Sequence, residues 1–163
     1  MAADDPVIEH PNRRRAASKI TKVLIVLLLL VSAALTAIVT IGGWDVLQGA
    51  KALQVAYIAL YVFMAFLVAR WNRGVLPVAA ALAIVMLIFA AIAGPQWFER
   101  DKAGFADPSI DAGTLGLVTL LLVPVQALLI VAAMQGFRQA WNVEVERRPD
   151  EGARGSRAVP QPS

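Results

Sequence analysis

The stretch "AAIAGPQWFERDKAGFADPSIDAGTLGLVTLLLVPVQ", Ala90–Gln126, decides the fold, because it breaks one apolar run with charges and loop formers and then begins another. The same alternation extends outward through the chain. Runs without Asp, Glu, Lys, Arg or His cover residues 23–41, 52–69, 75–93 and 115–136. With 58% hydrophobic and 17% charged residues, the composition is far more apolar than that of a typical soluble domain.

Each apolar run is long enough to cross a membrane as a helix, since about 20 residues span a hydrocarbon core of about 30 Å. The period-two alternation of a membrane β-barrel strand is not visible. The sequence therefore predicts an all-α integral membrane protein, a bundle of four transmembrane helices at about 20–42, 51–70, 74–94 and 113–138. The membrane domain covers 19–141. The tails, 1–18 and 142–163, are predicted to be mostly disordered because they are too polar to bury a core.

Basic residues are distributed unevenly about these helices. Twelve of the 15 Lys and Arg residues lie in the two tails or in the second connection, and the other side carries only Lys51, Arg100 and Lys102. By the positive-inside rule, both termini are predicted to be cytoplasmic. The connection from Gly94 to Thr114 is then the one longer extracytoplasmic loop. The excess of Arg over Lys, with abundant Ala, is associated with bacterial genomes, so the predicted location is a bacterial plasma membrane.

Tryptophans mark the same boundaries without reference to charge. An indole ring prefers the headgroup zone of a bilayer, where its N–H can reach water. We therefore interpret as interface anchors the four tryptophans at predicted helix ends, Trp44, Trp71, Trp97 and Trp141.

The outer loop combines aromatic and charged side chains, and two interpretations are open. The loop could be a docking surface for a partner, or a short amphipathic segment whose rings only anchor it at the membrane surface. Asp107 and Asp111 alone are too few ligands to indicate a metal site. The candidate docking residues are Phe98, Glu99, Arg100, Asp101, Lys102 and Phe105.

Uncharged polar residues recur inside the predicted helices. Ser32, Thr36 and Thr40 fall every four residues on the first helix, which predicts a face for close helix packing; the alternative is a polar strip along a permeation path. Tyr61, deep in the second helix, is expected to hydrogen-bond to a neighbouring helix or a water. On this helix, one face carries Gln54, Tyr57 and Tyr61.

The fourth helix contains a proline near its middle. Pro124 has no N–H and clashes with the carbonyl four residues earlier, so a kink is expected there. Thr119 and Gln126 flank it and could satisfy the freed carbonyl or bond across to Ser32 or Thr36. The site is either a static kink that improves packing or a hinge beside a polar group at the midplane.

The C-terminal segment "WNVEVERR", Trp141–Arg148, alternates Val and Glu. It is interpreted either as a solvated extension of the fourth helix or as a short strand that adds to the sheet edge of a cytoplasmic partner.

The residue types present exclude several functions. The predicted helices contain no ionisable residue of the kind that a proton pump uses, and the chain has no cysteine and one histidine, His10, in a tail. Nucleotide loops and nucleophile elbows are absent, so we predict no catalytic residue, cofactor, metal or nucleic acid.

The sequence thus favours a small non-catalytic protein, an accessory or assembly subunit of a larger membrane complex. Its partners would be membrane lipids and other integral membrane proteins or further copies of itself, contacted through the first-helix hydroxyl face and the outer loop. The alternative is a small transporter or channel that acts as an oligomer, with Thr119, Gln126 and the first-helix hydroxyls along its path.

Overall fold

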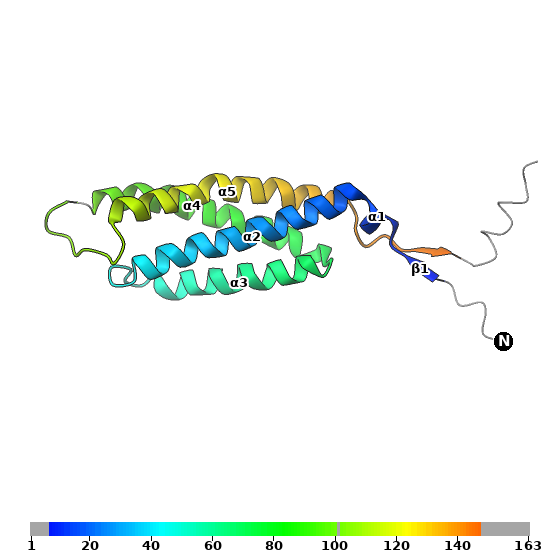
Figure 1. Cartoon of the computed structure of the whole chain (residues 1–163), viewed down its shortest axis with the longest axis horizontal. Coiled ribbons are helices and arrows are strands. Elements are labelled where there is room, and N and C mark those ends of the chain that lie inside the picture. The colour runs from blue at the N-terminus through cyan, green and yellow to red at the C-terminus, as the bar shows by residue number, and fades with distance from the viewer. Residues whose placement is uncertain (1–6, 101, 148–163) are drawn as a thin grey trace, which may run out of the picture.

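The protein is a helical bundle in which four helices are long and apolar enough to cross a membrane, as the sequence predicts. The computed structural model describes residues 7–100 and 102–147 (Figure 1). The long helices are α2 (Ala16–Gly42), α3 (Lys51–Ala69), α4 (Leu76–Glu99) and α5 (Ala112–Arg138). The short elements are β1 (Val7–Glu9), α1 (Pro11–Arg14), the 3-10 turn η1 (Arg73–Val75) and β2 (Val145–Arg147).

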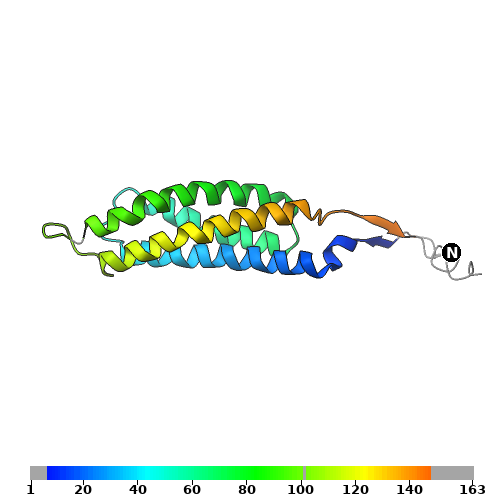
Figure 2. The same cartoon turned by 90° about the horizontal axis from the view of Figure 1, so that it is seen from above.

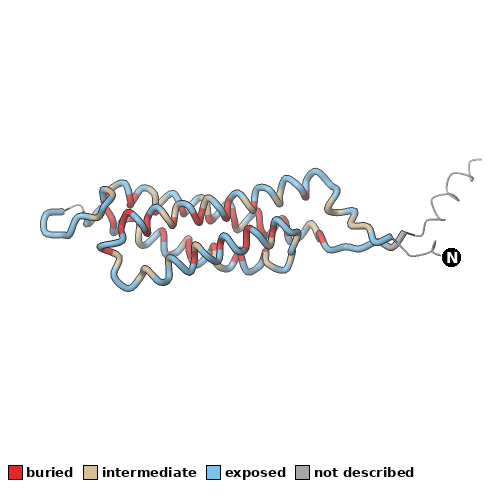
Figure 3. Tube along the Cα trace, turned by 60° about the horizontal axis from the view of Figure 1, so that its bottom comes forward, coloured by how far each residue is buried: buried red, intermediate tan, exposed pale blue. Residues whose placement is uncertain are grey.

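The four long helices lie side by side along the long axis of the molecule (Figures 1 and 2). The closest packing is between α4 and α5, followed by α2 with α3 and α2 with α5, whereas α3 and α4 make little contact with each other. Buried residues line the inside of this arrangement along its length (Figure 3). One of the four seams of the bundle is therefore partly open.

Small residues allow α4 and α5 to approach closely. A Cβ added at Gly94 would lie 2.5 Å from a methyl carbon of Leu120, and one at Gly116 would lie 2.9 Å from the ring of Phe98. Close approach of this kind is how helices pack in a bilayer, where no hydrophobic force draws them together.

Helix α4 ends at Glu99 and not near 94, so the predicted long loop shortens to residues 100–111. Gly94 and Pro95 suggested an end, but the helix continues through Pro95, whose side faces outward. Two residues after Pro95, the Trp97 ring is buried against the bundle. Trp97, Phe98 and Glu99 therefore belong to a helix, and the residue of the predicted loop that lies outside the described residues is Asp101.

Residues 7–18, predicted to be disordered, contain β1, α1 and the start of α2, and residues 145–147 of the mostly disordered C-terminal tail form β2. Strands β1 and β2 pair antiparallel, with Val7 opposite Arg147 and Glu9 opposite Val145, and α2 already begins at Ala16. The expected extension of the fourth helix is wrong, because α5 ends at Arg138. A strand does form there, but its partner is the N-terminal strand of the same chain. The remaining tail residues, 1–6 and 148–163, lie outside the described residues.

Side chains next to β1 form hydrogen bonds to the segment between α5 and β2. Asn12 donates a hydrogen bond from Nδ2 to the carbonyl of Ala140 (3.0 Å), and Arg13 donates from Nε to the carbonyl of Trp141 (3.1 Å). The sequence could not show this, because the contacts join residues that only the finished bundle brings to the same end.

Candidate functional site

A buried hydrogen-bond network joins three helices near the middle of the bundle. Gln126 of α5 donates from Nε2 to Ser32 Oγ of α2 (2.9 Å), and the Tyr61 hydroxyl of α3 donates to Gln126 Oε1 (2.9 Å). All three side chains have no exposed surface. The expected bonds from Gln126 to the first helix and from Tyr61 to a neighbouring helix are confirmed.

The hydroxyl face of α2 lies inside the chain. Ser32, Thr36 and Thr40 are buried, and each donates to the carbonyl four residues earlier, at 2.7 to 2.8 Å. Thr40 Oγ1 also lies 2.6 Å from Oε1 of Gln54 on α3. The face therefore packs against other helices of its own chain, and its three polar side chains are buried there.

The residues expected to form one site around Pro124 are separated by the structure. Helix α5 runs without a break through Pro124, which is exposed on the outside of the bundle. Gln126 lies in the buried network. Thr119 donates to the carbonyl of Leu115 (2.7 Å) and lines a different feature, a cleft between α3 and α4.

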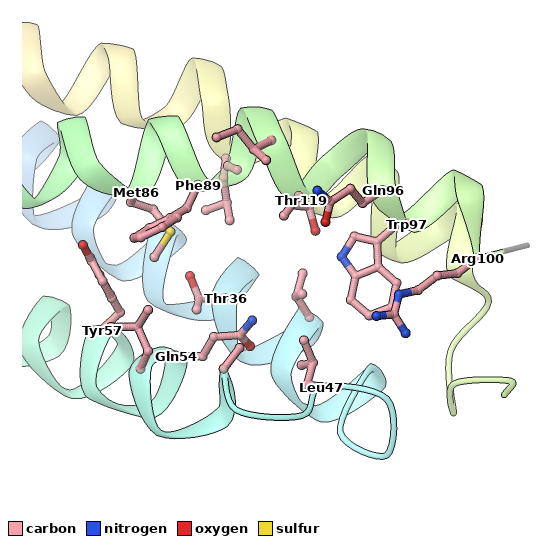
Figure 4. A pocket seen from close by; sticks show the side chains of 17 residues that line it. Thr36, Leu47, Gln54, Tyr57, Met86, Phe89, Gln96, Trp97, Arg100 and Thr119 are labelled. Atoms are coloured by element: carbon pink, nitrogen blue, oxygen red, sulfur yellow. The ribbon is translucent and has the colours of Figure 1, made fainter. Parts of the chain in front are cut away.

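This cleft, called here the α3–α4 cleft, has a volume of about 370 Å³. It lies in the half of the bundle nearer the connection between α4 and α5. Helix α3 is on one side of the cleft and α4 on the other (Figure 4). Aliphatic and aromatic side chains form most of its wall. They include Val39 from α2, Leu53 from α3, Phe89 and Ile92 from α4, and Leu122 from α5.

Polar groups are few in the α3–α4 cleft and come from every helix. Gln54 and Tyr57 come from α3, Met86 and Phe89 from α4, and Thr36 from α2 (Figure 4). Gln96, Trp97 and Arg100 stand at the end of α4. Of the described residues that line the cleft, Arg100 is the one with a charge; its guanidinium carbon lies 5.8 Å from the centre of the Trp97 ring.

Sequence reasoning missed this cleft. The shared face of Gln54, Tyr57 and Tyr61 pointed to part of one wall, but Tyr61 belongs to the buried network and not to the cleft. Nothing in the sequence indicated that α3 and α4, neighbours along the chain, would separate at one end.

The outer loop is a polar segment with exposed rings. Phe98 and Phe105 are exposed, and Lys102 forms an ion pair with Glu99 at 2.7 Å. The loop ends at Asp111, whose carboxylate caps α5 by accepting from the backbone N–H of Thr114 (2.9 Å). This capping role accounts for Asp111 without a metal. Among the described residues, no group of three or more His, Asp or Glu side chains could hold a metal ion.

The tryptophans divide into exposed and buried rings. All four lie at or near helix ends, but Trp141 has no exposed surface and Trp97 is almost fully buried. The Trp141 ring meets the Trp71 ring edge to face, with centroids 5.3 Å apart, and the Lys22 ammonium lies 4.2 Å from the centre of the Trp71 ring. Trp44 is the ring with the most exposure, at 46%.

The four apolar helices define a multi-pass membrane protein. Comparisons with protein-family models, with curated proteins and with solved structures find no match to this chain. Its function is therefore argued from the geometry above.

Proposed function

We propose that this protein is a non-catalytic accessory or assembly subunit of a larger membrane complex, located in a bacterial plasma membrane with both termini in the cytoplasm. The orientation is supported by the concentration of basic residues at the end where β1 and β2 meet. Arg13, Lys22, Arg70 and Arg73 belong to that end, and the basic residues at the opposite end, among those that the structure describes, are Lys51, Arg100 and Lys102.

The observation that carries the proposal is the two-stranded ribbon of β1 and β2, which extends beyond the end of the bundle (Figures 1 and 2). Its apolar side chains are exposed: Val7 and Ile8 at 57%, and Val145 at 42%. A ribbon of two strands is at best marginally stable in water, and a third strand stabilises it by pairing with an open edge. An extended segment from a partner's cytoplasmic domain is the occupant that fits these edges.

The geometry gives less support to a transporter. A permeation path needs polar groups that are free to meet a solute, whereas Ser32, Tyr61 and Gln126 bond to one another in the packed core. Thr36 and Thr119 do line the α3–α4 cleft, but each donates its hydroxyl proton to its own helix.

The test is a pull-down of the tagged protein from its own membranes in mild detergent, with identification of the associated proteins and measurement of the native mass. We expect a stoichiometric set of partners that Ile8→Asp releases. Ile8 is exposed, so this change leaves the bundle intact. Phe105→Asp, at the other end and of similar exposure, is the matched control and retains the partners.

Two results would contradict this assignment. Release by Phe105→Asp alone would move the docking surface from the ribbon to the outer loop. Recovery of only a homo-oligomer would end the subunit proposal and direct attention to flux measurements in proteoliposomes.

A further inference from the structure

The length of the α3–α4 cleft corresponds to one leaflet of a bilayer. Along α4 its wall runs from Met86 to Arg100, about 21 Å at 1.5 Å per residue. Half of a membrane that is 40–45 Å thick with its headgroups measures about 20–22 Å. The cleft thus extends from the headgroup level at Arg100 to near the midplane at Met86.

Along α4, the residues that line the cleft begin at Met86. Tyr61 and Met64 of α3 share one buried cluster with Ala79 and Ala83 of α4. A partner's transmembrane helix would need an open groove along about 30 Å, the whole hydrocarbon thickness. A chain that belongs to one leaflet needs only the half that is open.

The chemistry of the cleft changes along its length. Its inner part is apolar, with Phe89, Leu53 and Leu122 among the lining side chains, and its volume of about 370 Å³ lies at the small end of the range typical of ligand sites. Its outer end carries Gln96 and Arg100. This is the gradient of a lipid, from alkyl chain to polar headgroup.

The charged residue that lines the outer end of the cleft is Arg100. In Figure 4 the Arg100 side chain turns back under Trp97 at the mouth of the cleft. On the α3 side, the Lys51 ammonium lies 4.8 Å from the centre of the Trp44 ring. Within residues 7–100 and 102–147, neither cation forms an ion pair. A guanidinium binds phosphate oxygens through two parallel N–H donors, so an anionic phosphate suits this position.

We propose that the α3–α4 cleft is a binding site for an anionic phospholipid of the leaflet nearest Arg100. One acyl chain lies between α3 and α4 against Phe89 and Leu53, and the phosphate is bound by Arg100. The site is independent of the ribbon, so it stands whether or not the protein is a subunit of a complex.

Native mass spectrometry after reconstitution in nanodiscs with equal phosphatidylglycerol and phosphatidylcholine tests this site. We expect the released wild-type protein to retain phosphatidylglycerol in preference, and Arg100→Gln to reduce that preference by about fivefold. Lys102→Gln is the matched control, because Lys102 lies at the same end and carries the same charge, but does not line the cleft and is paired with Glu99. An equal loss in both variants would overturn the site, since the preference would then be general surface electrostatics.

A second pair of measurements tests the acyl-chain position. Ala93→Phe fills the cleft from α4 and should reduce retention of both lipids, whereas Ala91→Phe, on the exposed surface of the same helix, should not. A photoreactive amino acid at Ile92 should label the lipid. Labelling of a second copy of the chain would make the cleft a dimer seam and overturn the proposal, as would lipid retention unchanged by Ala93→Phe in a protein that still elutes as folded.

Discussion

The two ends of the bundle each contain two tryptophans and use them differently. At the end that holds β1 and β2, Trp71 and Trp141 meet edge to face beneath Lys22, and the chain segments before α2 and after α5 are bonded to each other. At the other end Trp97 lies beside the α3–α4 cleft, and Trp44 is exposed. We call the first end the collar, defined by Trp71, Trp141, Lys22 and the bonded segments before α2 and after α5. The other end is open between α3 and α4.

In this protein, connection length and packing differ between the two ends of the α3–α4 seam. Helices α3 and α4 are joined by the short segment 70–75, which holds them together at the collar end. At the opposite end α4 follows α5 through close contact at Gly94, while α3 follows α2 through Thr40 and Gln54. The two pairs diverge, and the cleft lies between them.

The largest expected effect comes from removing the collar's buried ring. Trp141→Ala leaves a cavity beside Trp71 and should lower the free energy of unfolding by about 3–5 kcal/mol, measured by denaturant titration in mixed micelles. Trp44→Ala, a ring with 46% exposure at the open end, should change it by far less. Equal losses would mean that the two ends are equally packed.

Overpacking the α4–α5 seam should have the next largest effect. Gly94→Leu places side-chain atoms where Leu120 lies and should cost about 1–3 kcal/mol in the same titration. Ala91→Leu, one turn earlier on the exposed surface, is the control and should be close to neutral. If Gly94→Leu were also neutral, close approach would not hold α4 to α5.

The network at the middle of the bundle should contribute a smaller amount. Gln126→Leu removes the bonds to Ser32 and Tyr61 and should cost about 1–2 kcal/mol, since such bonds in membranes average about 0.6 kcal/mol and Tyr61 is left without its acceptor. Gln135→Leu, an exposed glutamine of the same helix, should have little effect. If both changes lowered the free energy of unfolding by a similar large amount, the cause would be the loss of a polar side chain from α5 and not the loss of the buried network.

The smallest effect is expected at the collar's surface. Lys22→Gln removes the ammonium above Trp71 and should cost about 0.5–1 kcal/mol, read as a lower midpoint of unfolding. Lys19→Gln, an exposed lysine one turn earlier, keeps this contact and controls for the general effect of charge. The cation above the ring would be without influence if the two variants unfolded alike.

The four helices could be predicted because they depend on local pattern, whereas the bond from Gln126 to Ser32 was one of two roles open to that side chain and joins residues 94 positions apart. Long apolar runs specify helices in a bilayer, and a buried amide must find a partner. The continuation of α4 past Pro95 could not, because it depends on how Trp97 packs.

The pairing of β1 with β2 and the α3–α4 cleft also could not be predicted from the sequence. The alternation in residues 141–148 left a strand open as one of two interpretations, but it could not identify the partner strand, because pairing of Glu9 with Val145 joins residues far apart along the chain. The cleft exists because α3 and α4 make little contact with each other. No residue in either helix indicates this in the sequence.

Pairing between β1 and β2 also depends on how the chain has been inserted into the membrane. The strands can meet only after the last helix has been synthesised, and only if the chain has crossed the bilayer an even number of times. A chain with one helix left out or reversed would hold residues 7–9 and 145–147 on opposite sides of about 30 Å of hydrocarbon, out of reach of each other. The ribbon therefore cannot form in a molecule with an odd number of crossings, and a partner that recognises the ribbon would exclude such molecules from assembly.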